Sequence, residues 1–122
     1  MEEGIFILTE DRAGEYRFRF QLRNGQILGS SEGYASKAGC RRGVESVRRN
    51  ASKADIVEEG YGRCPKFELF SDRSGKFRFR LLASNGEAIL ASDAYSDVRQ
   101  AEEACRKVQC LAISSPVEDH SV

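Results

Sequence analysis

The sequence DRAGEYRFRFQLRNG, residues 11–25, returns almost intact as DRSGKFRFRLLASNG at residues 72–86. In both copies apolar residues alternate with charged or polar residues, which is the pattern of a strand with one buried face. An Asp-x-x-Gly turn signal precedes each strand, and an Asn-Gly pair follows it. Each copy therefore predicts a half-buried strand between two hairpins. The Asn-Gly pairs favour a type I′ turn, in which both central residues have positive φ.

The match continues on both sides of this strand without a gap. Phe6 is matched by Phe67 and Tyr34 by Tyr95, 61 positions further on in each case. Each copy predicts three strands, a helix and a final strand, which makes two tandem β(3)-α-β units. One unit alone has a small sheet and core and would be only marginally stable, so we expect an intramolecular pseudo-dimer in a single domain, residues 1–122. Repeat one, the linker and repeat two are residues 5–59, 60–65 and 66–119.

Two amphipathic helices are expected, one in each repeat. The first, over residues 37–50, is capped by Ser36, and the second is capped by Asp97. Gly39 and Gly43 lie beside the apolar stripe of the first helix. Each costs up to about 1 kcal/mol of helix propensity, and we expect a close approach to the sheet to compensate. The two apolar stripes are Cys40, Val44, Val47 and Ala51, and Val98, Ala101, Cys105, Val108 and Leu111.

The charge balance argues against several classes of protein. Lys and Arg together number 19, as do Asp and Glu, so no overall field draws the chain to nucleic acid or to an acidic membrane. No stretch approaches the roughly 20 apolar residues that span a bilayer. The acidic start, residues 1–4, lacks the basic region of a signal peptide. We expect a monomeric, cytoplasmic protein that does not bind membranes.

The chain offers little catalytic or metal chemistry. No two of its four cysteines have Cys-x-x-Cys spacing, and the only histidine is His120 near the end of the chain. Cys40 and Cys105 are expected to be reduced and buried on the helices. No set of histidine, cysteine and carboxylate recurs in both copies, and there is no phosphate-binding glycine loop. We therefore expect no enzyme activity, no metal and no cofactor.

Several motifs resemble those of the YegP-like family of small bacterial and archaeal proteins. They are Asp-x-x-Gly-x-Tyr/Phe-Arg-Phe-Arg, Asn-Gly, the run SEGYASKAGC at residues 31–40, Val-Glu-Ser-Val and Asn-Ala. The resemblance implies an α+β fold in which the two units share one antiparallel sheet, exchange their C-terminal strands and pack their two helices. It implies that single-copy relatives reach the same arrangement as homodimers. It implies no activity, because the family is of unknown function.

Repeat two departs from the family pattern at the start of its helix. Residues 96–101 have lost the glycines that repeat one keeps. A site that needs two equivalent helix starts is therefore not expected here, whereas an asymmetric site on repeat one remains compatible with the sequence.

The first candidate site is an outward row of four arginines on the two repeated strands. A basic sheet face can offer forked donors to a phosphate, a carboxylate or a nucleic-acid backbone. The alternative is a solvated face on which acids such as Glu15, Glu68 or Glu87 pair with the arginines across strands. The aromatic residues of these strands alternate with the arginines and are expected in the core. The row comprises Arg17, Arg19, Arg78 and Arg80.

The second candidate site is the basic start of the first helix, at Lys37, Arg41 and Arg42. Free backbone amides at a helix start can assist anion binding. Most basic helix faces are simply solvated, however. Repeat two has Glu102 and Glu103 where repeat one has the two arginines, so this patch is one-sided.

The sequence favours a small binding or interaction module that uses the sheet face or the cleft between the units. The sequence does not identify the ligand, which could be a protein or a small anion. The hypothesis includes a stress-related role. The alternative is weak, salt-sensitive binding of nucleic acid or anions through the arginine row or the first helix. An uncharacterised enzyme is the third hypothesis.

Overall fold

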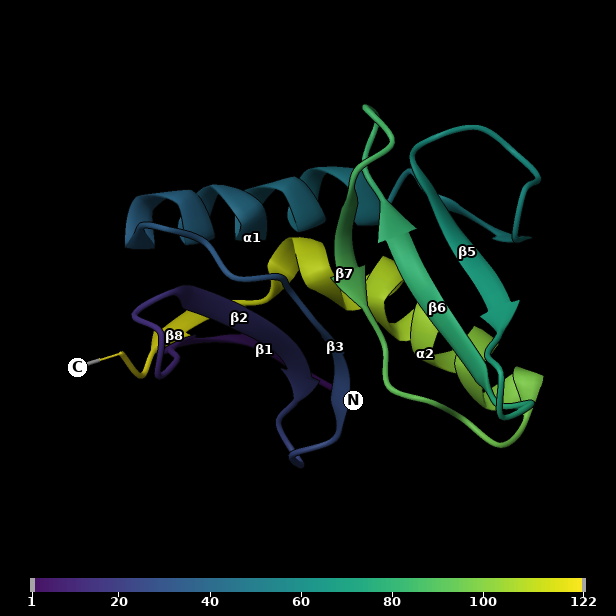
Figure 1. Ribbon diagram of the computed structural model, residues 1–122, viewed down its shortest axis with the longest axis horizontal. Coiled ribbons are helices and arrows are strands. Elements are labelled where there is room, and N and C mark those ends of the chain that lie inside the picture. Colours follow the sequence, from purple (N-terminus) through teal and green to yellow (C-terminus); the bar gives the residue numbers. More distant parts are fainter. Residues whose placement is uncertain (1, 122) are drawn as a thin grey trace.

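The structure is a computed structural model that describes residues 2–121. Both repeats contain three strands, a helix and a fourth strand (Figure 1), as the sequence predicted. Neither helix of the described part is long and apolar enough to cross a membrane. Repeat one comprises β1 (Gly4–Glu10), β2 (Tyr16–Leu22), β3 (Ile27–Ser30), α1 (Lys37–Ala51) and β4 (Asp55–Glu58). Repeat two comprises β5 (Lys66–Ser71), β6 (Phe77–Leu82), β7 (Ala88–Ala91), α2 (Val98–Leu111), a 3₁₀ turn (Ala112–Ser114) and β8 (Val117–Asp119).

Within residues 2–121, eight strands form one sheet in the order β4-β5-β6-β7-β3-β2-β1-β8. The six inner strands, β5-β6-β7-β3-β2-β1, are antiparallel to one another. The two outer strands are exchanged between the repeats: β4 pairs with β5, and β8 pairs with β1. These outer pairs are parallel. The predicted α+β fold and the strand exchange are confirmed, and the sheet is mixed.

The helices cover one face of the sheet and leave the other open. In Figure 1, β6 and β7 pass in front of the helices, whose contacts extend over both repeats. Helix α1 packs on β2, β5 and β7, and α2 packs on β3, β5 and β6. Cys40 and Cys105 are fully buried in this core, as expected, and burial raises the pKa of the Cys40 thiol to about 11. The largest core side chains, none more than 1% exposed, are Phe6, Phe18, Phe20, Phe67 and Phe79.

The Asn-Gly hairpins differ from the expected type I′ turn. Gly25 and Gly86 have φ of 95° and 87°, but no described residue other than glycine has a positive φ. The first hairpin is instead a three-residue loop in which the N–H of Leu22 donates to the carbonyl of Gln26 at 2.9 Å. The Asn24 side chain accepts a hydrogen bond from the N–H of Gln26 at 2.9 Å. This bond supports the turn without a positive φ at the asparagine.

The helix starts follow the predicted capping. Ser36 and Asp97 accept hydrogen bonds from backbone N–H groups in the first turns of α1 and α2, at 3.0 and 2.8 Å. At Gly43 a Cβ atom would lie 2.7 Å from Cζ of Tyr34 and 3.0 Å from the Phe18 ring. The expected close approach is therefore confirmed at this glycine, because any side chain would collide with the aromatic rings.

Each exchanged strand is also held by a helix of the other repeat. Arg48 of α1 donates to the carbonyl of Ser115, which lies shortly before β8. At the equivalent position of α2, Gln109 donates to the carbonyl of Ala54, directly before β4, at 2.8 Å. The two bonds are related by the internal repeat and tie the two units together.

Candidate functional site

The four arginines of the row share the open face of the sheet but lie in two separate pairs. In the strand register, Arg19 lies opposite Ser30, Ser30 opposite Ala91, and Ala91 opposite Arg80. These four side chains form one line across the centre of the sheet, which we call the central line. Three strand spacings, about 14 Å, separate its two arginines. The row is therefore two half-sites and not one cluster of four guanidinium groups.

Two of the arginines are paired with aspartates of the preceding turn. Arg17 Nε lies 2.9 Å from Asp11 Oδ2, and Arg78 Nε lies 3.0 Å from Asp72 Oδ2. The Arg17 guanidinium is the main cause of the lowered pKa of Asp11. The pairing expected with Glu15 is present at 3.9 Å from Arg17, but the sequence reasoning missed the aspartates. The signal that could have found them is the six-residue spacing from aspartate to arginine across a hairpin.

Arg80 belongs to a charge cluster that lies under the linker. Its guanidinium lies 3.0 Å from Glu68 and 2.7 Å from Glu59. Lys66 lies 3.2 Å from Glu68, and these two side chains are only 9% and 8% exposed. The N–H of Gly60, followed by Arg80 and Lys66, lowers the pKa of Glu68 although burial acts in the opposite direction. The expected pairing of an arginine with Glu68 is present, but the sequence reasoning missed the buried lysine.

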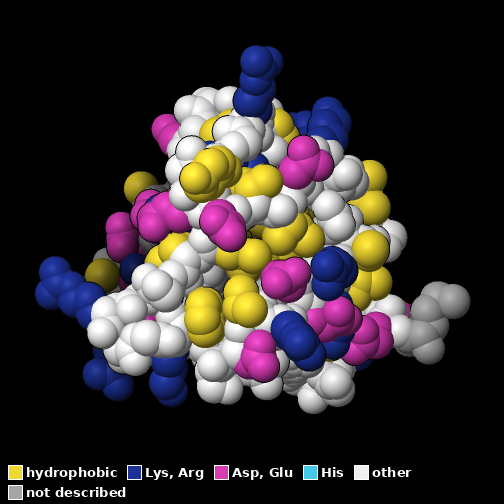
Figure 2. Space-filling view, turned by 90° about the vertical axis from the view of Figure 1, so that its right-hand side faces the viewer, with side chains coloured by type: hydrophobic (Ala, Val, Ile, Leu, Met, Phe, Trp, Pro, Cys, Tyr) yellow, Lys and Arg dark blue, Asp and Glu magenta, His cyan; other side chains and the backbone are white. Residues whose placement is uncertain are grey.

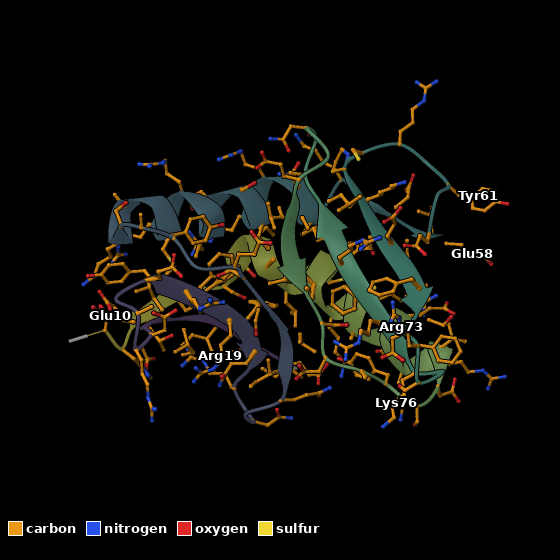
Figure 3. All side chains as sticks on the ribbon, in the orientation of Figure 1. Glu10, Arg19, Glu58, Tyr61, Arg73 and Lys76 are labelled. Atoms are coloured by element: carbon orange, nitrogen blue, oxygen red, sulfur yellow. The ribbon has the colours of Figure 1, made fainter. Side chains whose placement is uncertain are left out.

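Arg19 is the arginine of the row whose guanidinium forms no ion pair among the described residues. Its Nε donates to Oε1 of Gln21 at 2.8 Å, and no carboxylate of residues 2–121 lies within ion-pair distance. The cause is a sequence difference between the repeats: Ile7 lies opposite Arg19, whereas Glu68 lies opposite Arg80. Figure 3 labels Arg19 on the repeat-one half of the molecule.

The basic start of α1 is partly neutralised by the exchanged strand. Lys37 Nζ and Arg41 lie 3.0 and 3.3 Å from Oδ2 of Asp119 at the end of β8. The hydroxyl and backbone N–H of Ser121, followed by Lys37, hold the pKa of Asp119 well below its usual value. Arg42 is exposed and has no ion pair among the described residues. The helix start and the arginine row are therefore separate surfaces, each with one free arginine.

The described side chains do not assemble a metal site. Across residues 2–121 no group of three His, Cys, Asp or Glu is placed to hold a metal ion. What the two surfaces offer is donation of hydrogen bonds and charge to an anion, at Arg19 on the sheet and at Arg42 on the helix.

Comparisons with known proteins place the chain in a family. A family model described as "Domain of unknown function (DUF1508)" matches residues 11–58 and 72–119. The chain belongs to this family. It is 34% identical over 106 residues to a UPF0339 protein in the 5′ region of the ptx operon of Stutzerimonas stutzeri, covering 87% of this chain and 86% of the relative. It is 29% identical over 118 residues to YegP of Escherichia coli O157:H7, covering 97% and 98%.

The family includes solved structures and relatives of different length. The solution NMR structure of E. coli YegP, described as a protein of unknown function, matches with a TM-score of 0.81 at 27% identity, covering 99% of this chain and 96% of that chain. A UPF0339 protein of Agrobacterium fabrum is 49% identical over 53 residues, which is 43% of this chain but 86% of the relative. That relative is therefore about one repeat long. The resemblance to the YegP-like family is confirmed, and the family is of unknown function.

Proposed function

We propose that this protein is a non-enzymatic binding module that binds an anionic partner on the open face of its sheet, at Arg19. The observation that carries the proposal is that Arg19 has an amide as its partner but no carboxylate among residues 2–121. A guanidinium that is not neutralised can present forked donors to a carboxylate or a phosphate. Its neighbours on the central line, Ser30 and Ala91, are small and exposed, so they leave space for a ligand.

The proposed ligand is a small anion rather than a long polyanion. Three of the four arginines in the row are already paired with carboxylates, so one arginine of the row is left to bind a ligand. We further propose that the module works as a monomer in the cytoplasm. The stress-related role remains part of this hypothesis.

Weak, salt-sensitive nucleic-acid binding is the second candidate. The observation in its favour is that Arg42 is a second exposed arginine without an ion pair among the described residues. Two separated arginines give few phosphate contacts, and the net charge of zero supplies no long-range attraction. Binding of this kind is expected only at low salt.

A single NMR experiment separates the two candidates. The ¹⁵N-labelled protein is titrated with citrate, with inorganic phosphate, and with short single- and double-stranded DNA and RNA, at low and at moderate salt. The proposal predicts citrate or phosphate shifts centred on Arg19, Ser30 and Ala91. Arg19→Gln is expected to weaken this binding about tenfold, as for the loss of one charge-assisted hydrogen bond. The matched control is Arg78→Gln, which is expected to bind like the wild type because Asp72 already neutralises this arginine.

Other outcomes of the titration would count against the proposed site at Arg19. Nucleic-acid shifts that spread over the start of α1 and disappear at moderate salt, without a citrate or phosphate site, would support the second candidate. Equal loss of binding in Arg19→Gln and Arg78→Gln would contradict a site at Arg19. The absence of shifts with every probe would contradict both candidates.

A further inference from the structure

The internal repeat allows each position to be compared with its counterpart 61 residues along the chain. In repeat one, the first turn of α1 is tied to the end of β8. Lys37 Nζ lies 3.0 Å from Asp119 Oδ2 and 5.9 Å from the centroid of the Tyr16 ring, and Arg41 reaches the same carboxylate at 3.3 Å. Leu8, which lies opposite Asp119 in the strand register, is 0% exposed. Two basic side chains therefore close this region, which we call the α1 corner.

The equivalent region of repeat two, the α2 corner, has the same backbone but lacks both cations. Val98 and Glu102 stand where α1 has its two basic residues. Glu58 stands where β8 has its aspartate, in the same register, opposite Leu69. Among residues 2–121, no basic side chain lies within ion-pair distance of Glu58. Leu69 is half-buried, whereas its counterpart Leu8 is fully buried, so the missing cations leave the corner open.

A cavity of about 320 Å³ lies at the α2 corner. Its lining includes Leu69, Phe77 and Val98, together with the carboxylates of Glu58 and Glu59. Glu59 is already paired with an arginine at 2.7 Å, so Glu58 is the carboxylate left without a cation. Figure 2 faces this side of the molecule and shows hydrophobic side chains gathered at its centre with acidic side chains around them.

We propose that the α2 corner binds a lysine side chain of a partner polypeptide. The ammonium group pairs with Glu58, and the methylene stem packs on Phe77 and Val98. Lys37 is the template for this arrangement, because in repeat one it places its ammonium group on a carboxylate and near an aromatic ring at the equivalent location. This site goes beyond the anion site at Arg19, since it takes the opposite charge and is built from β4, β5, β6 and α2 rather than from β2.

The charges of the α2 corner select a basic occupant. An apolar side chain would bury Glu58 without a partner, which is unfavourable, and an anion would be repelled by Glu58. The backbone of the partner can also be accommodated, because β4 is an outer strand and its free edge can pair with an extended chain. Tyr61, which is 68% exposed, follows β4 and lies at the same end of the molecule as Glu58 (Figure 3). It offers a second aromatic surface to the partner.

The first test uses a peptide whose only charge is on lysine. Acetyl-Ala-Gly-Lys-Gly-Ala-amide is titrated into the ¹⁵N-labelled full chain, and the same peptide with Nε-acetyllysine is the matched control. Shifts are expected at Glu58, Phe77 and Val98 with a dissociation constant in the millimolar range. Acetylation is expected to weaken binding at least about threefold, through loss of the ion pair. Equal binding of the two peptides, no binding, or shifts only outside the α2 corner would overturn the proposal.

The second test changes individual residues of the α2 corner by mutation. Val98→Lys provides the missing lysine from within the chain and is expected to abolish peptide binding, whereas Val98→Leu is expected to retain it. Glu58→Gln is expected to weaken binding about two- to fivefold. Wild-type affinity in Val98→Lys, with the fold intact, would overturn the proposal.

The reciprocal variant gives an independent readout. Lys37→Val/Arg41→Glu gives the α1 corner the two helix residues of the α2 corner, Val98 and Glu102, and a second set of peptide shifts is expected around Asp119. A folded double variant without this second set would overturn the proposal.

A second copy of the chain is the remaining alternative occupant. We expect the resonances of the α2 corner to be independent of protein concentration when no peptide is present. Concentration-dependent shifts at Glu58 and Val98 would show that a second copy fills the corner, which would overturn the assignment to a different polypeptide.

Discussion

At the scale of single residues, Asp11 and Asp72 each connect a turn to an arginine on the following strand. Oδ1 of Asp72 accepts hydrogen bonds from the N–H groups of Ser74 and Lys76 at 2.9 and 3.1 Å, and Oδ2 accepts from Arg78 at 3.0 Å. One carboxylate thus shapes the hairpin and neutralises an arginine of the open face. The first role could be predicted, because Asp-x-x-Gly is a local pattern. The second has a weaker signal, the six-residue spacing from aspartate to arginine, because only the folded hairpin brings the arginine to the carboxylate.

Asp72 is expected to make the stability of the protein pH-dependent in acid. The Ser74 hydroxyl, followed by the Arg78 guanidinium, holds the pKa of Asp72 well below its ordinary value. A carboxyl whose pKa is lowered by folding stabilises the protein above its unfolded-state pKa, and this stabilisation is lost as the pH falls below about 4. In Asp72→Asn, the urea midpoint at pH 7 is expected to be lower than in the wild type. It is also expected to fall less steeply from about pH 4 to pH 2.

Asp93→Asn is the control for this measurement, because Asp93 is exposed and has no ion pair among the described residues. Its pH curve is expected to follow that of the wild type. Parallel curves for Asp72→Asn and the wild type would show that the Asp72 carboxylate does not contribute to stability.

At the scale of secondary-structure elements, the strands and helices could be predicted and their partners could not. Alternation along residues 16–22 identifies β2, and Ser36 identifies the start of α1, because both signals are local. The partners of the exchanged strands β4 and β8 were implied only by the family resemblance. The linker was expected only to separate the repeats, yet the N–H of Gly60 donates to Glu68 and the carbonyl of Tyr61 accepts from Lys66, so its backbone joins the charge cluster around Glu68.

The candidate site at Arg19 also depends on strand register, that is, on which residues of neighbouring strands lie opposite each other. The sequence placed four arginines on one face, which the structure agrees with, but it could not say which of them would remain free. That depends on the residue opposite each arginine, which is Ile7 for Arg19 and Glu68 for Arg80. Such pairings are set by the alignment of neighbouring strands and not by neighbours in the sequence.

Gln109 provides a test of the strand exchange. Its side chain donates to the carbonyl of Ala54, a residue that is 1% exposed. Gln109→Ala leaves this buried carbonyl without its partner, so we expect the free energy of unfolding in urea to fall by about 1 to 3 kcal/mol. Gln100→Ala, at an exposed position of the same helix, is the control and is expected to change it by less than about 0.5 kcal/mol. Equal effects of the two substitutions would exclude a special role for the Gln109 bond.

At the scale of the whole molecule, the two half-sheets are joined within residues 2–121 by one pair of residues in strand register, Ser30 and Ala91. The helices and the exchanged strands supply the remaining contacts between the repeats. A homodimer of identical repeats would carry every site twice. Two covalently joined repeats can differ, and here repeat one keeps a free arginine and a closed α1 corner, while repeat two neutralises Arg80 and leaves the α2 corner open.

This difference predicts how the isolated repeats assemble. Repeat one alone, residues 1–62, is expected to form a strand-exchanged homodimer, in line with the existence of relatives about one repeat long. In that dimer β4 of one copy takes the place of β8, so Glu58 takes the place of Asp119 beside Lys37 and Arg41. The ion pairs that close the α1 corner are therefore retained.

Repeat two alone, residues 63–122, is expected to assemble poorly. In its homodimer, Asp119 would face Val98 and Glu102, so a like charge would replace the two cations of the α1 corner. Light scattering after size-exclusion chromatography is expected to give a dimer for repeat one and no stable dimer for repeat two, with the full chain measured alongside as the reference. Val98→Lys/Glu102→Arg restores both cations and is expected to recover dimerisation of repeat two. If the unmodified repeats dimerise equally well, the charges at the corners do not control how the two units assemble.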